Sequence, residues 1–156
     1  GTIASLWEAN MDLLKTPLPI DLHDKKWRIY ARNFGSEPQY IAPTASVSDT
    51  LATEGCVVYG KTQHAILSTD VIVEKDAQVI DSVIMPGAVI RAGAVVRRAI
   101  VGENAEINAG CAVGQESGKI AVVGSNVRLP DNFVVKAGEM ADAEFVAKAE
   151  GGRELV

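Results

Sequence analysis

The sequence predicts an all-β fold, a single-stranded parallel β-helix built from hexapeptide repeats. Aliphatic residues recur every five or six positions between residues 71 and 113, and three such steps make one full period, as from Val73 to Ile90. A small or branched residue lies two positions before each of them, and both sets point inward because side chains alternate along a strand. Short strands and corners at this period are the signature of a β-helix with three strands in each coil. The aliphatic set is Val73, Val79, Ile84, Ile90, Val96, Val101, Ile107 and Val113, and the smaller set is Val71, Ala77, Ser82, Ala88, Ala94, Ala99, Ala105 and Cys111.

Other regular structures do not fit this pattern. An amphipathic helix needs apolar residues at i, i+3, i+4 and i+7, and a hairpin sheet needs longer alternating strands. The inward column continues on both sides of the window, with a break at 114–121. We therefore expect about five coils and assign the β-helix to residues 41–136. The added members are Val47, Ala52, Val58, Thr62 and Leu67 upstream, and Val123, Leu129 and Val135 downstream.

Residues 2–15 are predicted to form a helix that precedes the coils. Thr2 can cap its first turn, Ser5 and Glu8 have the spacing of a capping box, and Pro17 ends it. A lone helix of this length is marginal in water, and its apolar face is too large to stay exposed. We therefore expect it to pack on the β-helix or on another domain. Its apolar residues are Ile3, Leu6, Trp7, Met11, Leu13 and Leu14.

A connector and a tail complete the predicted organisation. Residues 16–40 carry three prolines and a glycine, which predicts an extended connector whose Trp27 and Tyr30 dock on a neighbouring surface. Residues 137–156 are expected to form a charged tail, with one or two helical turns at 142–149.

Composition argues against two kinds of partner, nucleic acid and membrane. A net charge of −5 over 156 residues lacks the electrostatic footprint of nucleic-acid binding. No apolar run approaches the ~20 residues of a membrane span. No signal peptide is visible, and an opening Gly in place of Met suggests a fragment. Cys56 and Cys111 fall on small inward positions, so we expect buried, reduced thiols in a cytoplasmic protein.

Five motifs, taken in order along the chain, resemble one enzyme family. They are G-T-I-A-S-L-W-E-A-N-M-D-L-L, W-R-I-Y, P-Q-Y-I, E-G-C-V-V-Y-G and D-S-V-I-M-P. Together they resemble the C-terminal part of bacterial glucose-1-phosphate adenylyltransferase, also called ADP-glucose pyrophosphorylase, from Gly1 to about Ile107. The β-helix of that family is left-handed, and the resemblance implies the same hand here, whereas the periodicity alone leaves the hand open.

The resemblance implies a part of a larger enzyme. The family joins an N-terminal nucleotide-binding domain to this β-helix, so the resemblance implies that residues 1–40, the helix and connector, pack against that domain. It makes ADP-glucose and pyrophosphate from ATP and glucose 1-phosphate, with Mg²⁺, for glycogen synthesis. Its Gly-rich nucleotide loop, sugar-phosphate lysine and metal-binding aspartates belong to the N-terminal domain, which we expect to be absent here. We therefore expect a non-catalytic regulatory and assembly domain, without a metal or cofactor of its own, in a homo- or hetero-oligomer.

Arg97, Arg98 and Lys119 are the candidate effector-binding residues. The family's effector-binding arginines lie on the β-helix near the domain interface, and Arg97 and Arg98 are the nearest matches. Adjacent guanidiniums can bind a phosphorylated effector through charge-assisted hydrogen bonds. A solvated pair neutralised by nearby acids is the alternative. Lys119 belongs to a Q-E-S-G-K insertion at 115–119 that interrupts the coil and would overhang the same edge.

Tight corners predict a polar column on one edge of the prism. In most repeats, three residues separate an inward aliphatic residue from the next small inward residue. At Gln63–His64, Ile80–Asp81 and Arg97–Arg98 there are two. These corners recur once in each full period, so the column should stack at about 4.8 Å per coil, with Ser48–Asp49 one coil earlier. We expect Asp81 to be ionised and paired with Arg98.

A hexapeptide acyltransferase that uses acetyl-CoA, with His64 as general base, is the alternative function. The preceding helix and connector, and the absence of a long protruding loop, count against it. A zinc site of the three-histidine type is excluded because His23 and His64 are the two histidines of the chain. A structural spacer without a ligand is the third interpretation.

Overall fold

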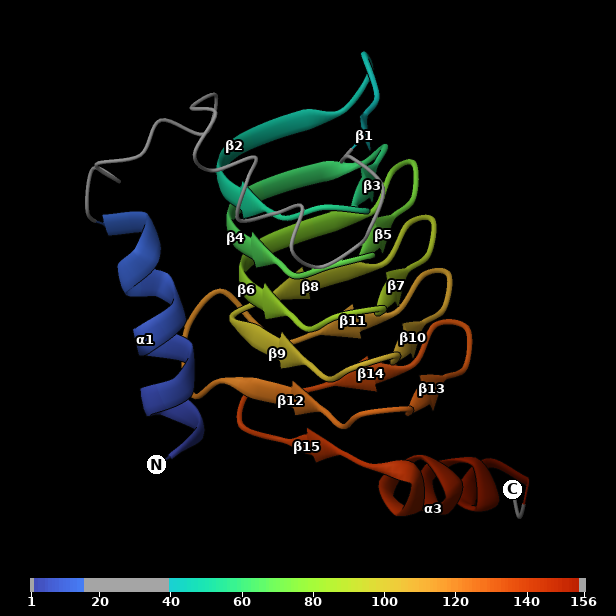
Figure 1. Cartoon of the computed structure of the whole chain (residues 1–156). Helices are drawn as coiled ribbons and strands as arrows, with labels where there is room; N and C mark the ends of the chain where they lie inside the picture. The colour runs from blue at the N-terminus through green and yellow to red at the C-terminus, as the bar shows by residue number, and fades with distance from the viewer. Residues whose placement is uncertain (1, 16–39, 155–156) are drawn as a thin grey trace.

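The structure, a computed structural model, describes residues 2–15 and 40–154. Over these ranges the chain forms an N-terminal helix, a triangular prism of about six stacked coils, and a C-terminal helix (Figure 1). The parallel β-helix predicted from the repeat is confirmed, with about six coils in place of the expected five. The predicted connector, with its two aromatic residues, lies outside the described residues except for Tyr40.

The strands build three flat faces. Face A is a six-stranded parallel sheet, whereas faces B and C belong to one larger sheet that bends around a shared edge. The first three strands of the larger sheet cross this edge and contribute to both faces; below them each coil supplies one strand to each face. Face A holds β1 (Tyr40–Ile41), β3 (Val57–Val58), β5 (Ile72–Val73), β7 (Val89–Ile90), β10 (Glu106–Ile107) and β13 (Arg128–Leu129). The strands that cross the edge are β2 (Ser46–Ala52), β4 (Lys61–Leu67) and β6 (Gln78–Ile84). Face B continues with β8 (Val95–Arg97), β11 (Ala112–Val113) and β14 (Val134–Val135), and face C with β9 (Ala99–Val101), β12 (Ala121–Val123) and β15 (Met140–Ala141).

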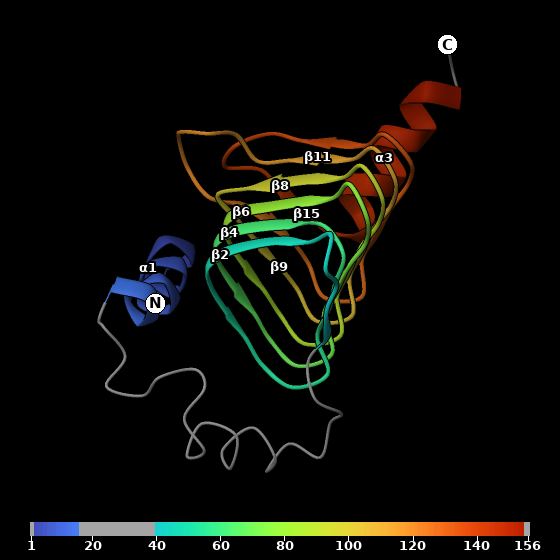
Figure 2. The same ribbon diagram turned by 90° about the horizontal axis from the view of Figure 1, so that it is seen from above.

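The β-helix is left-handed. Seen from above in Figure 2, the chain runs from face B around the shared edge to face C and then to face A, which is anticlockwise. Each successive coil lies farther from the viewer, and an anticlockwise path that recedes is a left-handed screw. This is the hand that the family resemblance implies, and it departs from the right-handed crossover usual in parallel sheets.

Inward side chains of all coils form one continuous core. The aliphatic column and the small column predicted from the repeat are almost fully buried between residues 52 and 135. Both cysteines are buried and free, as expected. Val47 differs, with 39% of its surface exposed, because it lies in the first coil at one end of the prism. Thr62, the polar member of the aliphatic column, is buried and accepts a hydrogen bond from the Thr50 hydroxyl at 3.1 Å.

Helix α1 (Ile3–Lys15) packs lengthwise on the outside of face C (Figure 1). Thr2 caps it as predicted, because its hydroxyl accepts a hydrogen bond from the Ser5 N–H at 3.0 Å. Met11 is 1% exposed, and the helix therefore has the β-helix as its packing partner. The residues that meet α1 form an outward apolar column on face C, made of Leu51, Ile66, Val83 and Ile100.

The C-terminal end of the prism is covered by helix α3 (Ala143–Glu154). Asp142 caps this helix through its carboxylate, which accepts from the Phe145 N–H at 2.7 Å. The Phe145 ring meets Phe133 edge-on at 6.2 Å between centroids. The coils run to β15, beyond the predicted boundary at residue 136, and the tail is a 12-residue helix in place of one or two turns. Neither described helix is long and apolar enough to cross a membrane.

Candidate functional site

The edge shared by faces B and C carries a stack of tight corners. Asp49, His64, Asp81 and Arg98 occupy equivalent positions, and each has a positive φ between 42° and 52°. The predicted column on a single edge is therefore confirmed. Aspartate tolerates this left-handed backbone well, whereas a long side chain at positive φ is unusual. Arg98, with a φ of 42°, has the longest side chain of the four corner residues.

Asp81 pairs with His64, and the expected pair with Arg98 is wrong. The Asp81 carboxylate lies 2.9 Å from Nδ1 of His64 in the coil above. Its backbone carbonyl accepts a hydrogen bond from the Trp7 indole N–H at 2.8 Å. The column therefore separates into a histidine–aspartate pair and an arginine that turns toward the insertion.

The insertion replaces one tight corner without disturbing the strands. Val96 pairs with Val113 at the usual period of the repeat, whereas Ala99 pairs with Ala121, so the added residues lengthen the coil between these two pairs. Gly114 begins the excursion with a φ of +78°, and a Cβ there would collide with the carbonyl oxygen of Arg97. At the other end, Lys119 O accepts from the Gly138 N–H of the next coil at 3.0 Å. The predicted insertion at 115–119 is thus a loop anchored at both ends.

The three candidate residues differ in their partners. Arg97 ends β8 and donates to Glu116 of the insertion at 2.8 Å, so a carboxylate neutralises it. Arg98 contacts the same insertion further along the chain, where its Nη2 and Nε donate to the carbonyl oxygen of Gly118 at 3.2 and 3.4 Å. Lys119 follows that glycine and lines the same groove as Arg98. The structure brings Arg98 and Lys119 together and separates Arg97 from them.

A groove of about 570 Å³ lies between α1, the edge and the insertion. Its walls combine the first turns of α1 with the end of the insertion and the coil below it. The lining residues are Thr2, Ile3, Ala4, Trp7 and Glu8 from the helix side, and Arg98, Gly118, Lys119, Ile120 and Gly138 from the prism side. Ile120, which directly follows the insertion, also packs into the apolar contact between α1 and face C.

The groove carries excess positive charge. Among the described residues, neither Arg98 nor Lys119 has a carboxylate partner, and Glu8 is the one acid that lines the groove. The N-terminal turn of α1 adds the positive end of the helix dipole. Arg98 is held by Gly118 and by the Trp7 ring, whose centroid lies 5.0 Å from its Cζ. Its Nη1 thus keeps two N–H donors for an anion.

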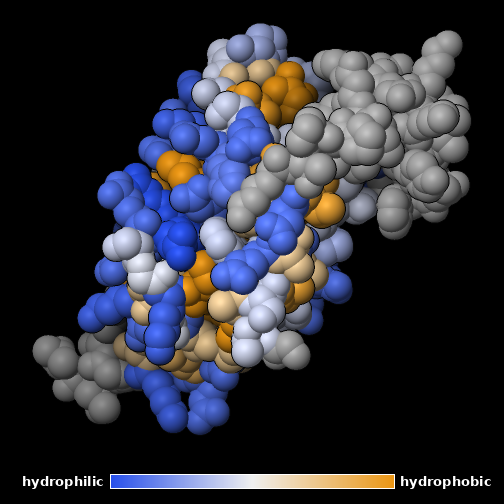
Figure 3. Space-filling view, turned by 90° about the vertical axis from the view of Figure 1, so that its left-hand side faces the viewer, coloured by the Kyte–Doolittle hydropathy of each residue, from blue (hydrophilic) through white to orange (hydrophobic). Residues whose placement is uncertain are grey.

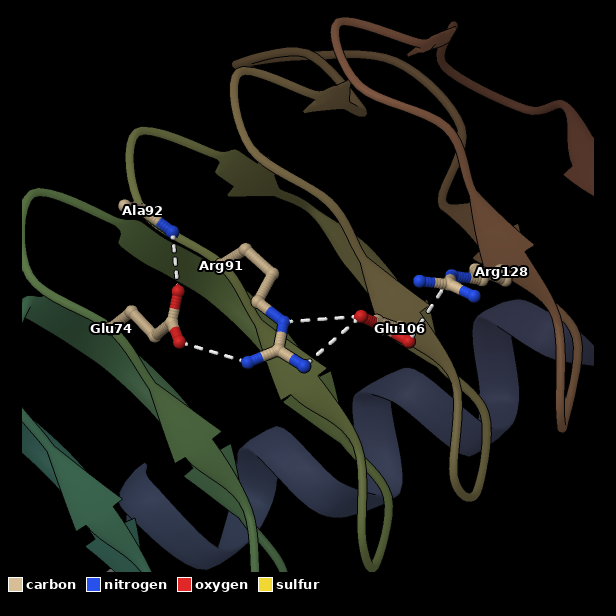
Figure 4. A network of polar contacts seen from close by, with 5 residues as sticks. All are labelled: Glu74, Arg91, Ala92, Glu106 and Arg128. Carbon is tan, nitrogen blue, oxygen red and sulfur yellow. Dashed lines mark hydrogen bonds and ion pairs between the residues drawn. The ribbon is translucent and has the colours of Figure 1, made fainter.

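A second polar network, on face A, is internally satisfied. Arg91 donates to Glu74 at 2.9 Å and to Glu106 at 3.0 and 3.1 Å, and Glu106 also lies 3.4 Å from Arg128 (Figure 4). Hydrogen bonds to Glu74 and Glu106 raise the pKa of Arg91. Glu74 uses its other oxygen to accept from the Ala92 N–H at 3.0 Å. Acidic and basic side chains from neighbouring coils alternate and pair in this network, so the network stabilises the stack of coils.

Sequence reasoning missed the part of the groove that α1 supplies. The pattern predicts apolar packing for Trp7, yet this residue also contacts the backbone of Asp81 and the Arg98 side chain. The available signal was the outward apolar column on face C, at the same spacing as the inward one. It marks the face that a helix covers. Figure 3 shows this side as mostly hydrophilic with separate apolar patches.

Comparison with known proteins places the chain among hexapeptide domains. The family model described as "GlmU-like, C-terminal hexapeptide" matches residues 39–119. The chain is 47% identical over 116 residues to glucose-1-phosphate adenylyltransferase of Bacillus mycoides strain KBAB4, and equally to that of Bacillus anthracis. The matches cover 74% of this chain and 31% of each relative, in the C-terminal region. The chain thus spans about a third of the length of these relatives.

Solved structures share the fold. The acetyltransferase domain of PglB from Neisseria gonorrhoeae FA1090 superposes with a TM-score of 0.55 at 23% identity, over 76% of this chain and 59% of that one. At this level of identity the likeness concerns the coiled architecture alone.

Proposed function

The chain belongs to the GlmU-like C-terminal hexapeptide family, as the counterpart of the C-terminal third of glucose-1-phosphate adenylyltransferase, and from this we propose that it is the regulatory and assembly domain of such an enzyme. The whole enzyme would make ADP-glucose and pyrophosphate from ATP and glucose 1-phosphate with Mg²⁺, for glycogen synthesis in the cytoplasm. Catalysis would reside in an N-terminal domain, and this chain would be inactive alone.

The groove beside α1 is the proposed effector site, and its ligand class is a phosphorylated small molecule. The observation that carries this proposal is the pair of cations, Arg98 and Lys119, without a carboxylate partner in the described part of the chain. A guanidinium already fixed in orientation binds phosphate oxygens with less loss of side-chain entropy. Arg97 is assigned a supporting role, because Glu116 ties it to the insertion that carries Lys119.

Two measurements test this function. Pyrophosphate release from ATP and glucose 1-phosphate is expected from the full-length enzyme and not from this chain alone; release by the purified chain would contradict the proposal. In the full-length enzyme, Arg98→Ala should remove the change in rate that a panel of sugar phosphates produces. Arg128→Ala is the matched control, since this exposed arginine lies on face A. An unchanged response in Arg98→Ala would rule out the groove as effector site.

Self-association is part of the proposal. The first coil leaves Tyr40, Ile41 and Val47 exposed at 49%, 38% and 39%, next to a strand edge that no further coil covers among the described residues. Exposed strand edges and apolar ends of solenoids favour association. Light scattering of the purified protein should show an oligomer, and a monomer at high concentration would speak against it.

One observation favours acyl transfer as the second candidate function. His64 has its Nδ1 paired with Asp81, and the other ring nitrogen would then be available as a general base. Acetyl-CoA should in that case raise the melting temperature of the chain, and His64→Ala should abolish acetyl transfer while the rise remains, because a general base acts on the acceptor and not on the cofactor. A melting temperature that responds to sugar phosphates and not to acetyl-CoA would exclude this candidate.

A further inference from the structure

We propose that Trp7 is a positioning residue of the anion site, so that the docking of α1 on the prism and the binding of a phosphate ester are one coupled equilibrium. This inference rests on the proposed effector role of the groove. It adds that an anion bound in the groove acts on the protein through the docking of α1. Its basis is that a single side chain of α1 touches both the tight edge and the arginine that would bind the ligand.

Trp7 makes two different contacts with adjacent corners of the edge. Its indole N–H donates to the carbonyl oxygen of Asp81 at 2.8 Å, which fixes the orientation of the ring against the coils. The ring centroid lies 5.0 Å from the Arg98 Cζ, one coil further on. The first contact aligns the ring, and the aligned ring then supports the guanidinium.

Among the described residues, Arg98 takes one of its two supports from α1, namely the Trp7 ring. Two of its nitrogens share one acceptor, the carbonyl of Gly118, at 3.2 and 3.4 Å, and that acceptor lies in the insertion loop. The remaining support is the Trp7 ring. Arginine otherwise loses considerable rotamer entropy when it is ordered around a ligand. A cation–π contact contributes roughly 0.5–2 kcal/mol, which corresponds to a change in affinity of about two- to thirtyfold.

Linkage makes the effect reciprocal. If the docked helix increases the affinity of the groove for an anion, the bound anion stabilises the docked helix by the same factor. Thr2, Ile3 and Ala4 line the groove as well, so an anion would also meet the positive end of the helix dipole. Glu8 opposes this attraction from the next turn. Whether α1 is docked would therefore depend on whether the groove holds an anion.

The first test needs no ligand. Trp27→Phe leaves Trp7 as the single tryptophan of the chain. In that background Arg98→Ala should shift Trp7 emission to longer wavelength and speed amide exchange within α1, because one support of the docked ring is gone. Arg128→Ala, which removes a guanidinium from face A, should change neither. Unchanged emission and exchange in Arg98→Ala would overturn the coupling.

The second test measures affinity for glucose 6-phosphate and for inorganic phosphate by calorimetry, with glucose as the uncharged control. Trp7→Leu should weaken binding of the phosphate compounds about five- to twentyfold, within the range of a lost cation–π contact. Trp7→Phe keeps an aromatic ring and should recover part of the loss. Leu6→Ala, at an exposed position on the same helix, should bind like the wild type. Saturating glucose 6-phosphate should slow exchange of the α1 amides.

The outcomes separate this inference from the function on which it rests. If Arg98→Ala abolishes binding while Trp7→Leu binds as tightly as wild type, the groove is the anion site and the role of Trp7 is wrong. If the wild-type chain binds neither phosphate compound, the effector role fails together with the ligand half of this inference. The ligand-free experiment then decides whether Arg98 holds the helix at all.

Discussion

Met11→Ala should detach α1 from the prism without unfolding the coils. Met11 is 1% exposed and belongs to the apolar contact with face C, together with the outward column that includes Ile66 and Val83. Truncation of a fully buried methionine costs roughly 2–5 kcal/mol. An isolated helix of 13 residues is marginal in water, so α1 holds little stability of its own to offset that loss.

Hydrogen exchange measured by mass spectrometry separates the helix from the coils. A loss of about 2–5 kcal/mol in docking should speed amide exchange in α1 by roughly 30- to 4,000-fold, since 1.4 kcal/mol is a factor of ten. Amides of β6 and β9 should keep their wild-type protection, because their hydrogen bonds run between coils. Leu13→Ala is the matched control, since Leu13 is 44% exposed on the same helix. Equal loss of protection in helix and coils would refute the reasoning and make α1 an integral part of the fold.

Three further perturbations test the prism itself. Ser82→Ala should destabilise the chain by about 1–3 kcal/mol in urea unfolding, because the buried hydroxyl accepts from the Ala99 N–H at 3.2 Å and that donor would be left unpaired; an unchanged midpoint would contradict this. Burial raises the pKa of Cys56 and Cys111, so the unfolded chain loses its thiol protons at a lower pH than the folded chain does. The free energy of unfolding should therefore fall as the pH rises past about 8.5. The slope of the free energy of unfolding against pH should be smaller in a Cys56→Ala variant. Glu106→Gln should cost at most about 1 kcal/mol, and the cost should diminish at high salt, since its arginine partners are partly exposed; a salt-independent loss would point to packing instead.

The prism could be predicted because its sequence signal is dense and local. Every coil repeats the same inward pair, so one misplaced residue does not change the period. Corners can be located equally well, since a change from three to two intervening residues at Ile80–Asp81 and Arg97–Arg98 shows directly in the spacing. Register within a parallel stack then follows from counting.

The contacts across the edge could not be predicted by counting. His64 and Arg98 are both one coil away from Asp81, and the spacing does not say which of them the carboxylate meets. In the structure the Arg98 guanidinium lies over the Trp7 ring and donates to Gly118, and the Asp81 carboxylate pairs with His64. The contact between α1 and the prism joins residues far apart in the sequence. The outward apolar column on face C is the one feature of the repeat that indicates this contact.

Coil length varies along this molecule while the strands stay aligned. The stretch of chain between stacked partners grows from Val47 and Thr62, through Val79 and Val96, to Ala99 and Ala121, and every difference is absorbed at a corner. Stacking therefore constrains the faces and leaves the vertices free to gain or lose residues. Evolution can therefore change the side chains that this edge presents by exchanging a vertex loop, and an engineer can graft a foreign loop between Val113 and Ala121 while the neighbouring coils keep the register.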